Sequence, residues 1–251
     1  MTLPRIGMVS AASVAQAQRR ATALDLGAPV SIRVNPRARR LLLRIDASAR
    51  QVELVLPYGV PAEHGLKFLA AQRGWIAARL MALPVPVPFA EGAIVPVFGV
   101  PHRICRASDP AAPPVAIVAS APGGAEIRVR GEPAHFARRV RDHLIALARQ
   151  ELTRRARLLA AQIGKPIARV GVRDTRSRWG SCSAKGCLSF SWRLVMMPES
   201  VMDYIVAHEV AHLVEMNHGP RFWQLVRTIT PDPVTPRAWL KRHRARLFSY
   251  G

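Results

Sequence analysis

The chain has 251 residues, which is enough to bury a hydrophobic core without disulfide staples and fits one large domain or two small ones. Its 3 cysteines cannot all pair, which excludes a small disulfide-rich secreted fold and indicates a reducing compartment. The formal net charge of +21 allows a nucleic-acid, membrane-surface or acidic partner. The charge is scattered and nearly all arginine, however, so a solvated basic surface is the simpler interpretation.

The N-terminal stretch, residues 1–29, is rich in alanine but interrupted by polar and charged side chains. It therefore lacks the continuous apolar region of a signal peptide. No segment of the chain approaches the roughly 18 uninterrupted apolar residues of a membrane span. We expect residues 1–29 to be disordered and the protein to be soluble and cytoplasmic, with no membrane partner.

A β-rich N-terminal domain with one helix is predicted over residues 30–131. Alternation of apolar and polar residues predicts strands within residues 30–57. Pro61 then begins a helical stretch that continues to about residue 83. Short β-like segments follow, and between them residues 108–124 are rich in Pro, Gly and Ala, which predicts a mobile insertion. The β-like segments are residues 94–97, 102–105 and 127–130.

A second domain is predicted over residues 132–251. Pro133 begins a long helix that ends at Gly164. Two strands around a turn follow, residues 168–174 and 187–194, and the alternation in the second is typical of an edge or half-exposed strand. Pro198 then begins a helix that is expected to run from Glu199 to about Met216.

The segment His208-Glu209-Val210-Ala211-His212 is an HExxH motif within this last helix. Residues four apart share one face of a helix, so both imidazoles can reach one metal ion. Glu209 is offset from His208 by about 100°, which lets it contact a water molecule on the ion rather than the ion itself. The same pattern can arise by coincidence on an ordinary core helix, so the case depends on a third ligand.

His218 is the favoured third ligand. It follows His212 by six residues, the interval between the last two histidines of the longer metzincin pattern. In a continuous helix it would lie about 15 Å along the axis from His208, so the chain must turn. Asn217 and the Gly219-Pro220 pair are suited to such a turn.

Glu215 is the competing ligand, three residues after His212 on the same stripe. On a continuous helix, Glu215 would lie about 10.5 Å along the axis from His208, which is too far for its short side chain to share an ion without strain. Glu215 is therefore better suited to support a histidine ligand than to bind the ion itself. Three protein ligands leave a fourth position for water, which is typical of a catalytic zinc site rather than a closed, cysteine-rich structural one. The pattern predicts one Zn²⁺ per chain, with Glu209 as the general base in amide hydrolysis.

The chain resembles the YgjP-like metallopeptidases, formerly a domain of unknown function (DUF45), which are related to the SprT-like and WLM proteins. The resemblance covers most of the chain outside residues 1–29 and 108–124. It implies an α+β fold with a zincin-like C-terminal domain, in which the HExxH helix lies beside a small sheet. It also implies a zinc-dependent hydrolase of polypeptide. Besides the HExxH motif, the matching residues are Arg176-Ser177-Arg178-Trp179-Gly180-Ser181-Cys182-Ser183, Trp192-Arg193-Leu194 with Pro198, Asp203-Tyr204-Ile205-Val206, and Asn217-His218 with Phe222-Trp223.

By analogy with zincins, the resemblance implies an edge strand that pairs with an extended peptide substrate. Residues 188–193 are the candidate strand, and Trp179, Phe190, Ser191 and Trp192 are candidate substrate contacts. Core packing is the alternative role for Phe190 and Trp192, and anchoring of a turn is the alternative for Trp179. The family usually has Asn where this chain has Ser191, and a hydroxyl cannot replace the paired donor and acceptor of an amide.

Two function classes follow from these observations. The leading prediction is a zinc metallopeptidase that acts on extended or unfolded polypeptide. The alternative is a nucleic-acid-associated protein, either a basic module with a structural zinc or a DNA-linked protease like some SprT-like relatives. Salt-dependent affinity for DNA or RNA would distinguish the alternative. Cys182 and Cys187 are interpreted as two small buried thiols, with a metal or redox pair as the less simple option.

Overall fold

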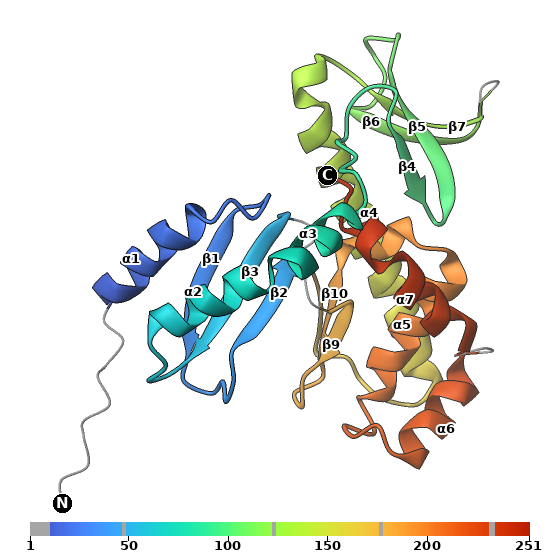
Figure 1. Ribbon diagram of the computed structural model, residues 1–251. Helices are drawn as coiled ribbons and strands as arrows, with labels where there is room; N and C mark the ends of the chain where they lie inside the picture. The colour runs from blue at the N-terminus through green and yellow to red at the C-terminus, as the bar shows by residue number, and fades with distance from the viewer. Residues whose placement is uncertain (1–10, 47–48, 122–123, 176–177, 231–233) are drawn as a thin grey trace, which may run out of the picture. The chain divides into compact units, whose positions relative to one another are not determined.

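Figure 1 shows the chain as a computed structural model, which describes residues 11–46, 49–121, 124–175, 178–230 and 234–251. The chain divides into two compact units, Met1–Val85 and Pro86–Gly251. Each unit combines helices with small sheets, which confirms the predicted α+β class. Within the described ranges, every helix is too short or too polar to cross a membrane.

The described residues of the first unit form a three-stranded sheet and three helices. In the sheet order β1-β3-β2, β1 is parallel to β3 and β2 is antiparallel to it. Alternate residues of β3, Val52, Leu54 and Leu56, are fully buried in the core that the helices complete. The elements are α1 (Ala11–Thr22), β1 (Val30–Asn35), β2 (Leu42–Asp46), β3 (Gln51–Pro57), α2 (Ala62–Ala71) and α3 (Arg73–Met81).

The expectation of a disordered start is wrong for Ala11–Thr22, which form α1. Alanine has the highest helix propensity, and Ala17 and Ala21 share one face and are buried in the core of the first unit. The Gln18 side chain accepts a hydrogen bond from the backbone N–H of Ile32 on β1 at 2.8 Å. The remainder of that prediction falls partly on residues 1–10, which lie outside the described residues.

The second unit contains two sheets and four α-helices among its described residues. Its four-stranded sheet has the order β4-β5-β7-β6, and its three-stranded sheet has the order β8-β10-β9. The elements are β4 (Ile94–Val97), β5 (Val100–Arg106), β6 (Val115–Ala121), β7 (Gly124–Val129), η1 (Pro133–His135), α4 (Phe136–Gln162), β8 (Arg169–Arg173), β9 (Gly180–Cys182), β10 (Cys187–Ser191), η2 (Trp192–Met196), α5 (Glu199–Ala211), α6 (Pro220–Ile229) and α7 (Val234–Leu247).

The mobile insertion predicted over residues 108–124 is wrong for Val115–Ala121, which form β6. This strand pairs antiparallel with β7, with Val115 opposite Val129 and Ile117 opposite Ile127. Val115 is buried and Ile117 packs against the same core. The β-branched residues therefore outweigh the surrounding Pro and Gly, because a neighbouring strand is available for pairing.

The two compact units divide between Val85 and Pro86 rather than at residues 131/132, where the sequence suggested a domain boundary. Residues 131/132 lie between β7 and η1 inside the second unit. The physical reason is a shared core: Ile127 and Val129 of β7 belong to the same hydrophobic cluster as Phe136 of α4. The four-stranded sheet therefore buries its apolar face within the second unit.

Helix α4 lies at the centre of the second unit and contacts both α5 and η2. Its buried residues recur every fourth position, which gives the helix a single apolar stripe that faces the core. Arg155 on α4 forms ion pairs with Glu199 and Asp203 of α5. These contacts fix the position of α5, the helix that carries the HExxH motif. The buried stripe comprises Phe136, Val140, Leu144, Ala148, Leu152, Ala156 and Ala160.

Candidate metal and active site

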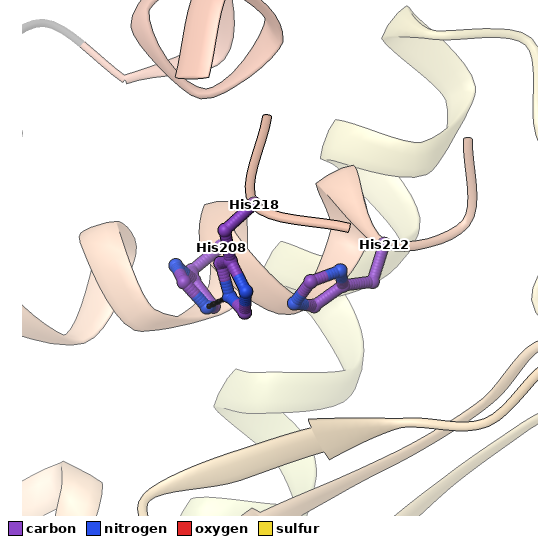
Figure 2. Close-up of side chains that lie close together, drawn as sticks. All are labelled: His208, His212 and His218. Atoms are coloured by element: carbon purple, nitrogen blue, oxygen red, sulfur yellow. Dashed lines mark hydrogen bonds between the residues drawn. The ribbon is translucent and has the colours of Figure 1, made fainter. Parts of the chain in front are cut away.

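Three imidazoles converge at the end of α5. His208, His212 and His218 each offer one nitrogen within 4.8 Å of the others, and Figure 2 shows the three rings turned toward one another. The Nε2 atoms of His208 and His218 are 3.1 Å apart. The structure thus brings together the three histidines that the spacing singled out. Among the described residues, they are the group of His, Cys, Asp and Glu side chains that could hold a metal ion.

The turn that returns His218 to the motif begins earlier than expected. Helix α5 ends at Ala211 rather than near Met216, and His212 is its C-cap. Backbone hydrogen bonds from Glu215 N–H to the Ala211 carbonyl and from Gly219 N–H to the Asn217 carbonyl, at 3.0 and 2.8 Å, then stabilise a compact turn. Continuing the helix would carry His218 away from the ion, whereas this turn brings it back.

The surroundings of His208 and His212 favour their neutral form. Burial, with smaller contributions from the neighbouring His212 and His218, lowers the pKa of His208 to about 4. Burial also lowers the pKa of His212. Neutral imidazole is the form that binds a metal, and nitrogen ligands of this kind are typical of zinc sites. The donor set therefore fits zinc.

Glu215 contacts the cluster through its backbone. Its carbonyl oxygen lies 2.9 Å from Nδ1 of His212, which leaves Nε2 of that ring available to the cluster. The Glu215 carboxylate is not part of the group that could hold a metal. A hydrogen bond of this type orients a metal-binding imidazole and fixes its tautomer. The supporting role expected for Glu215 is thus supplied by its main chain rather than by its side chain.

The Glu209 side chain packs against Gly180 of β9. It is only 7% exposed, and burial raises its pKa to about 7, while the charge of Arg178 acts in the opposite direction. The backbone of Gly180 passes directly against its carboxyl group, since a Cβ atom at Gly180 would lie 2.5 Å from Cγ and 2.7 Å from Oε1 of Glu209. A buried carboxyl group with a pKa near 7 is suited to proton transfer at neutral pH.

A family profile described as the YgjP-like metallopeptidase domain matches residues 39–243, which is most of the chain. The chain belongs to this family. The family resemblance inferred from the sequence is therefore confirmed, and this YgjP-like protein is a metallopeptidase, an enzyme that hydrolyses peptide bonds.

Two further comparisons were made. Comparison with curated proteins gives no significant match. Among solved structures, the crystal structure of the metallopeptidase zymogen of Pyrococcus abyssi abylysin is similar at 22% sequence identity, over 38% of this chain and 94% of that chain, with a TM-score of 0.33.

Strand β10 of this YgjP-like metallopeptidase is central in its sheet, so the expectation that residues 188–193 form an edge strand is wrong. β10 pairs with β8 on one side and with β9 on the other, so its backbone hydrogen-bonding groups are occupied on both sides. The alternation in its sequence reflects one apolar face and one polar face rather than an edge position. The edge strand beside α5 is β9.

The predicted substrate contacts on β10 and η2 are inaccessible. Phe190, Ser191 and Trp192 are 0% exposed and belong to the core, which was the alternative role for the two aromatic residues. The Ser191 hydroxyl instead accepts a hydrogen bond from the Arg193 backbone N–H and caps η2. Trp179 is half-buried and stacks on Phe248 at 5.0 Å between ring centroids, which anchors the C-terminal end of the chain.

Sequence reasoning gave no role to Phe222, Arg237 or Gly180. Phe222 stacks on His212 at 4.5 Å between centroids, and its position after His218 in the family pattern was the available signal. The guanidinium of Arg237 lies 5.0 Å from the centre of the Trp223 ring, and no local pattern marks it. Gly180 lay within the matching segment, but its contact with Glu209 depends on strand β9 and could not be read from the sequence.

The cysteines are free thiols. Burial raises the pKa of Cys182 to about 11, with smaller contributions from Glu209 and Cys187. A thiol with so high a pKa is protonated at neutral pH and is a poor nucleophile and metal ligand. Cys182 and Cys187 are nevertheless only partly buried, so the interpretation of two buried thiols is too strong, although the raised pKa of Cys182 agrees with an inert thiol.

Proposed function

We propose that this YgjP-like protein is a zinc-dependent peptidase with a zincin-type site. One zinc ion per chain is held by His208, His212 and His218, and Glu209 is the general base. The observation that carries the proposal is the convergence of His208, His212 and His218 beside the buried carboxyl group of the adjacent residue Glu209, whose pKa is about 7. Three protein ligands leave one position of a tetrahedral zinc open, as catalysis requires.

When bound, zinc supplies Lewis-acid chemistry, because it polarises a carbonyl group and lowers the pKa of water toward neutrality. The residues of this chain provide the proton transfer. Glu209, with its pKa near 7, can accept a proton during attack on the amide carbonyl and donate it to the departing amine. Its neighbour Gly180 leaves no side chain between the carboxyl group and the backbone of β9.

Strand β9 is the proposed place for an extended substrate. It is the edge of the sheet β8-β10-β9, and no described strand pairs with its outer side. An unpaired strand edge offers N–H and C=O groups to which an extended peptide can add. Because Gly180 of β9 lies against Glu209, a peptide on this edge would pass close to the general base.

The decisive experiment compares metal content and hydrolysis in the parent and in Glu209→Gln. The variant should keep about one zinc per chain and lose hydrolysis of an unfolded protein by roughly 10²- to 10⁴-fold, the usual contribution of a general base. Cleavage by Glu209→Gln at the parental rate would overturn the assignment of the base.

Two further variants test the ligand set in the same assays. His218→Ala should lose zinc, because it removes one of three imidazoles. Glu215→Gln should keep zinc, because only the backbone carbonyl of Glu215 contacts His212. Loss of zinc from Glu215→Gln but not from His218→Ala would make Glu215 the third ligand instead.

A further inference from the structure

A groove of about 550 Å³ lies over the three-stranded sheet β8-β10-β9. Its floor is a row of small residues in register across the three strands: Gly171 lies opposite Ser189, and Ser189 lies opposite Ser181. Side chains alternate between the faces of a strand, so this row is on the face opposite to Phe190, which is buried in the core. The small side chains leave a depression that larger residues would fill.

Arginines surround this depression. Arg169 and Arg173 lie two residues before and after Gly171 on β8 and therefore share its face, and Arg178 lies just before β9. All three are exposed. Among the described residues, none of the three forms an ion pair with a carboxylate, whereas Arg155 is paired with two carboxylates of α5. The lining of the groove contains no acidic residue.

The groove and Glu209 lie on opposite faces of β9, because Gly180 pairs with Phe190 of the core face whereas Ser181 pairs with Ser189 of the groove face. Ser181 and Cys182 line the groove and are also residues of β9, whose first residue, Gly180, lies against Glu209. The charge of Arg178 acts on the Glu209 carboxyl group. A peptide that pairs with the outer edge of β9 directs alternate side chains to the face of Ser181, which is the face of the arginines.

The geometry points to a subsite in this groove for acidic side chains of a polypeptide substrate. This inference rests on the proposed peptidase function and names the substrate class of that site. Arginine is matched to a carboxylate, because its planar fork can donate two parallel hydrogen bonds. A single-stranded nucleic acid fits less well, because the lining has no aromatic ring on which a base could stack. Because strand side chains alternate, the substrate carries its acidic residues at alternate positions.

Binding to the Glu209→Gln protein tests this inference, because it does not require hydrolysis. Fluorescent peptides of one scaffold carry Glu, Gln or Lys at alternate positions, and their dissociation constants are measured by anisotropy at low salt. The Glu peptide should bind about tenfold tighter than the Gln peptide, the value of one charge-assisted hydrogen bond. The Lys peptide should bind more weakly than both.

The variants separate the groove from the general charge of the chain. Arg169→Gln with Arg173→Gln should reduce the preference for Glu to about threefold or less, because most of the charge-assisted hydrogen bonds are lost. Arg149→Gln with Arg157→Gln removes the same charge from exposed positions of α4 and should keep the preference. Arg178 is left unchanged, since its charge also acts on Glu209. Circular dichroism and zinc content verify that both double variants are folded.

Three results would overturn the inference. The first is equal affinity for the Glu and Gln peptides. The second is an equal loss of preference in the two double variants, which would indicate a general charge effect. The third is displacement of the Glu peptide by single-stranded DNA at a lower concentration than by unlabelled peptide, with dependence on Arg169 and Arg173, which would make the groove a nucleic-acid site.

The outcome is distinguishable from a failure of the proposed function. Selective binding of the Glu peptide, together with a parent protein that cleaves no polypeptide, keeps the acidic subsite and rejects the peptidase. Cleavage by the parent that is indifferent to acidic side chains keeps the peptidase and rejects the subsite.

Discussion

Gly180 shows how the absence of a single side chain can determine the geometry of the site. A Cβ atom there would lie 2.5 Å from Cγ of Glu209, so Gly180→Ala must displace the carboxyl group or the strand. A shift of about 1 Å in a catalytic group can lower the rate by roughly 100-fold. We expect Gly180→Ala to keep its zinc and to lose most of its kcat, as measured in steady-state assays.

Gly74→Ala is the matched control for this prediction. Gly74 is a helical glycine with no neighbouring atom within 4 Å of an added Cβ. The substitution should leave kcat unchanged and stabilise α3 by up to about 1 kcal/mol, the difference in helix propensity. Parental kcat in Gly180→Ala would mean that the Glu209 carboxyl group has room to move.

Ionisation of Glu151 on α4 should make the free energy of unfolding depend on pH. Its pKa is lowered, first by the hydrogen bond from Arg154, although burial acts in the opposite direction. The folded state therefore binds this proton more weakly than the unfolded state. The stabilisation is present above about pH 4.5, the ordinary value, and is lost as the pH falls through the folded pKa.

Glu151→Gln removes this contribution. Because Arg154 is half exposed, we expect a loss of no more than about 1 kcal/mol at pH 7. The difference between parent and variant should be smaller at about pH 3 than at pH 7, because the carboxylate gains a proton as the pH falls toward the folded pKa. Urea unfolding of both proteins at the two pH values gives the result. A difference that does not change with pH would contradict the assigned ionisation.

At the scale of elements, Arg155 joins α4 to the helix that carries the metal-binding motif. Its side chain is only 12% exposed and pairs with Glu199 and Asp203. Arg155→Met should lower the free energy of unfolding by roughly 1–3 kcal/mol, less than for a fully buried pair because both carboxylates are partly exposed. Arg154→Met, at a 52% exposed position, is the control and should cost about 0.5 kcal/mol or less. Equal losses would show that Arg155 does not join the helices.

The sequence predicted the long helix α4 and the convergence of the three histidines, because these depend on local periodicity and spacing, but it missed α1. The strands within residues 30–57 and the start of α5 at Glu199 were found in the same way. The end of α5 was placed too late, because Leu213 and Val214 are compatible with a continuing helix. The position of β10 between β8 and β9 was missed, because alternation reports the faces of a strand and not its neighbours.

At the scale of the whole molecule, zinc should stabilise the fold. A ligand present at about 1,000 times its Kd stabilises the folded state by roughly 4 kcal/mol, which for a domain of this size raises Tm by about 10 °C. His212→Ala should abolish most of this shift. His135→Ala, at an exposed position outside the cluster, should retain it. Calorimetry with and without a chelator measures the zinc-dependent rise in Tm of each variant. An equal rise in His212→Ala and His135→Ala would contradict the assigned site.

The net charge of +21 is a whole-molecule property that the sequence could not assign to a site. The charge is spread along the chain, and which arginines meet is decided by strand register. Arg169 and Arg173 come from one strand and Arg178 from the loop before another, so their common groove exists only in the folded sheet. Similarly, the buried positions of Phe190 and Trp192 depend on the packing of the whole second unit.

The three clustered imidazoles come from one short continuous segment, His208 to His218, whereas the contact of Gly180 on β9 with Glu209 joins residues that are more distant in the chain. Contacts between residues near in sequence form faster during folding, because closing a short loop loses less chain entropy. We therefore expect the metal-binding segment to assemble and capture its ion before β9 packs against Glu209. A newly made chain would then carry its metal before it could hold a peptide, which protects neighbouring unfolded chains from premature cleavage.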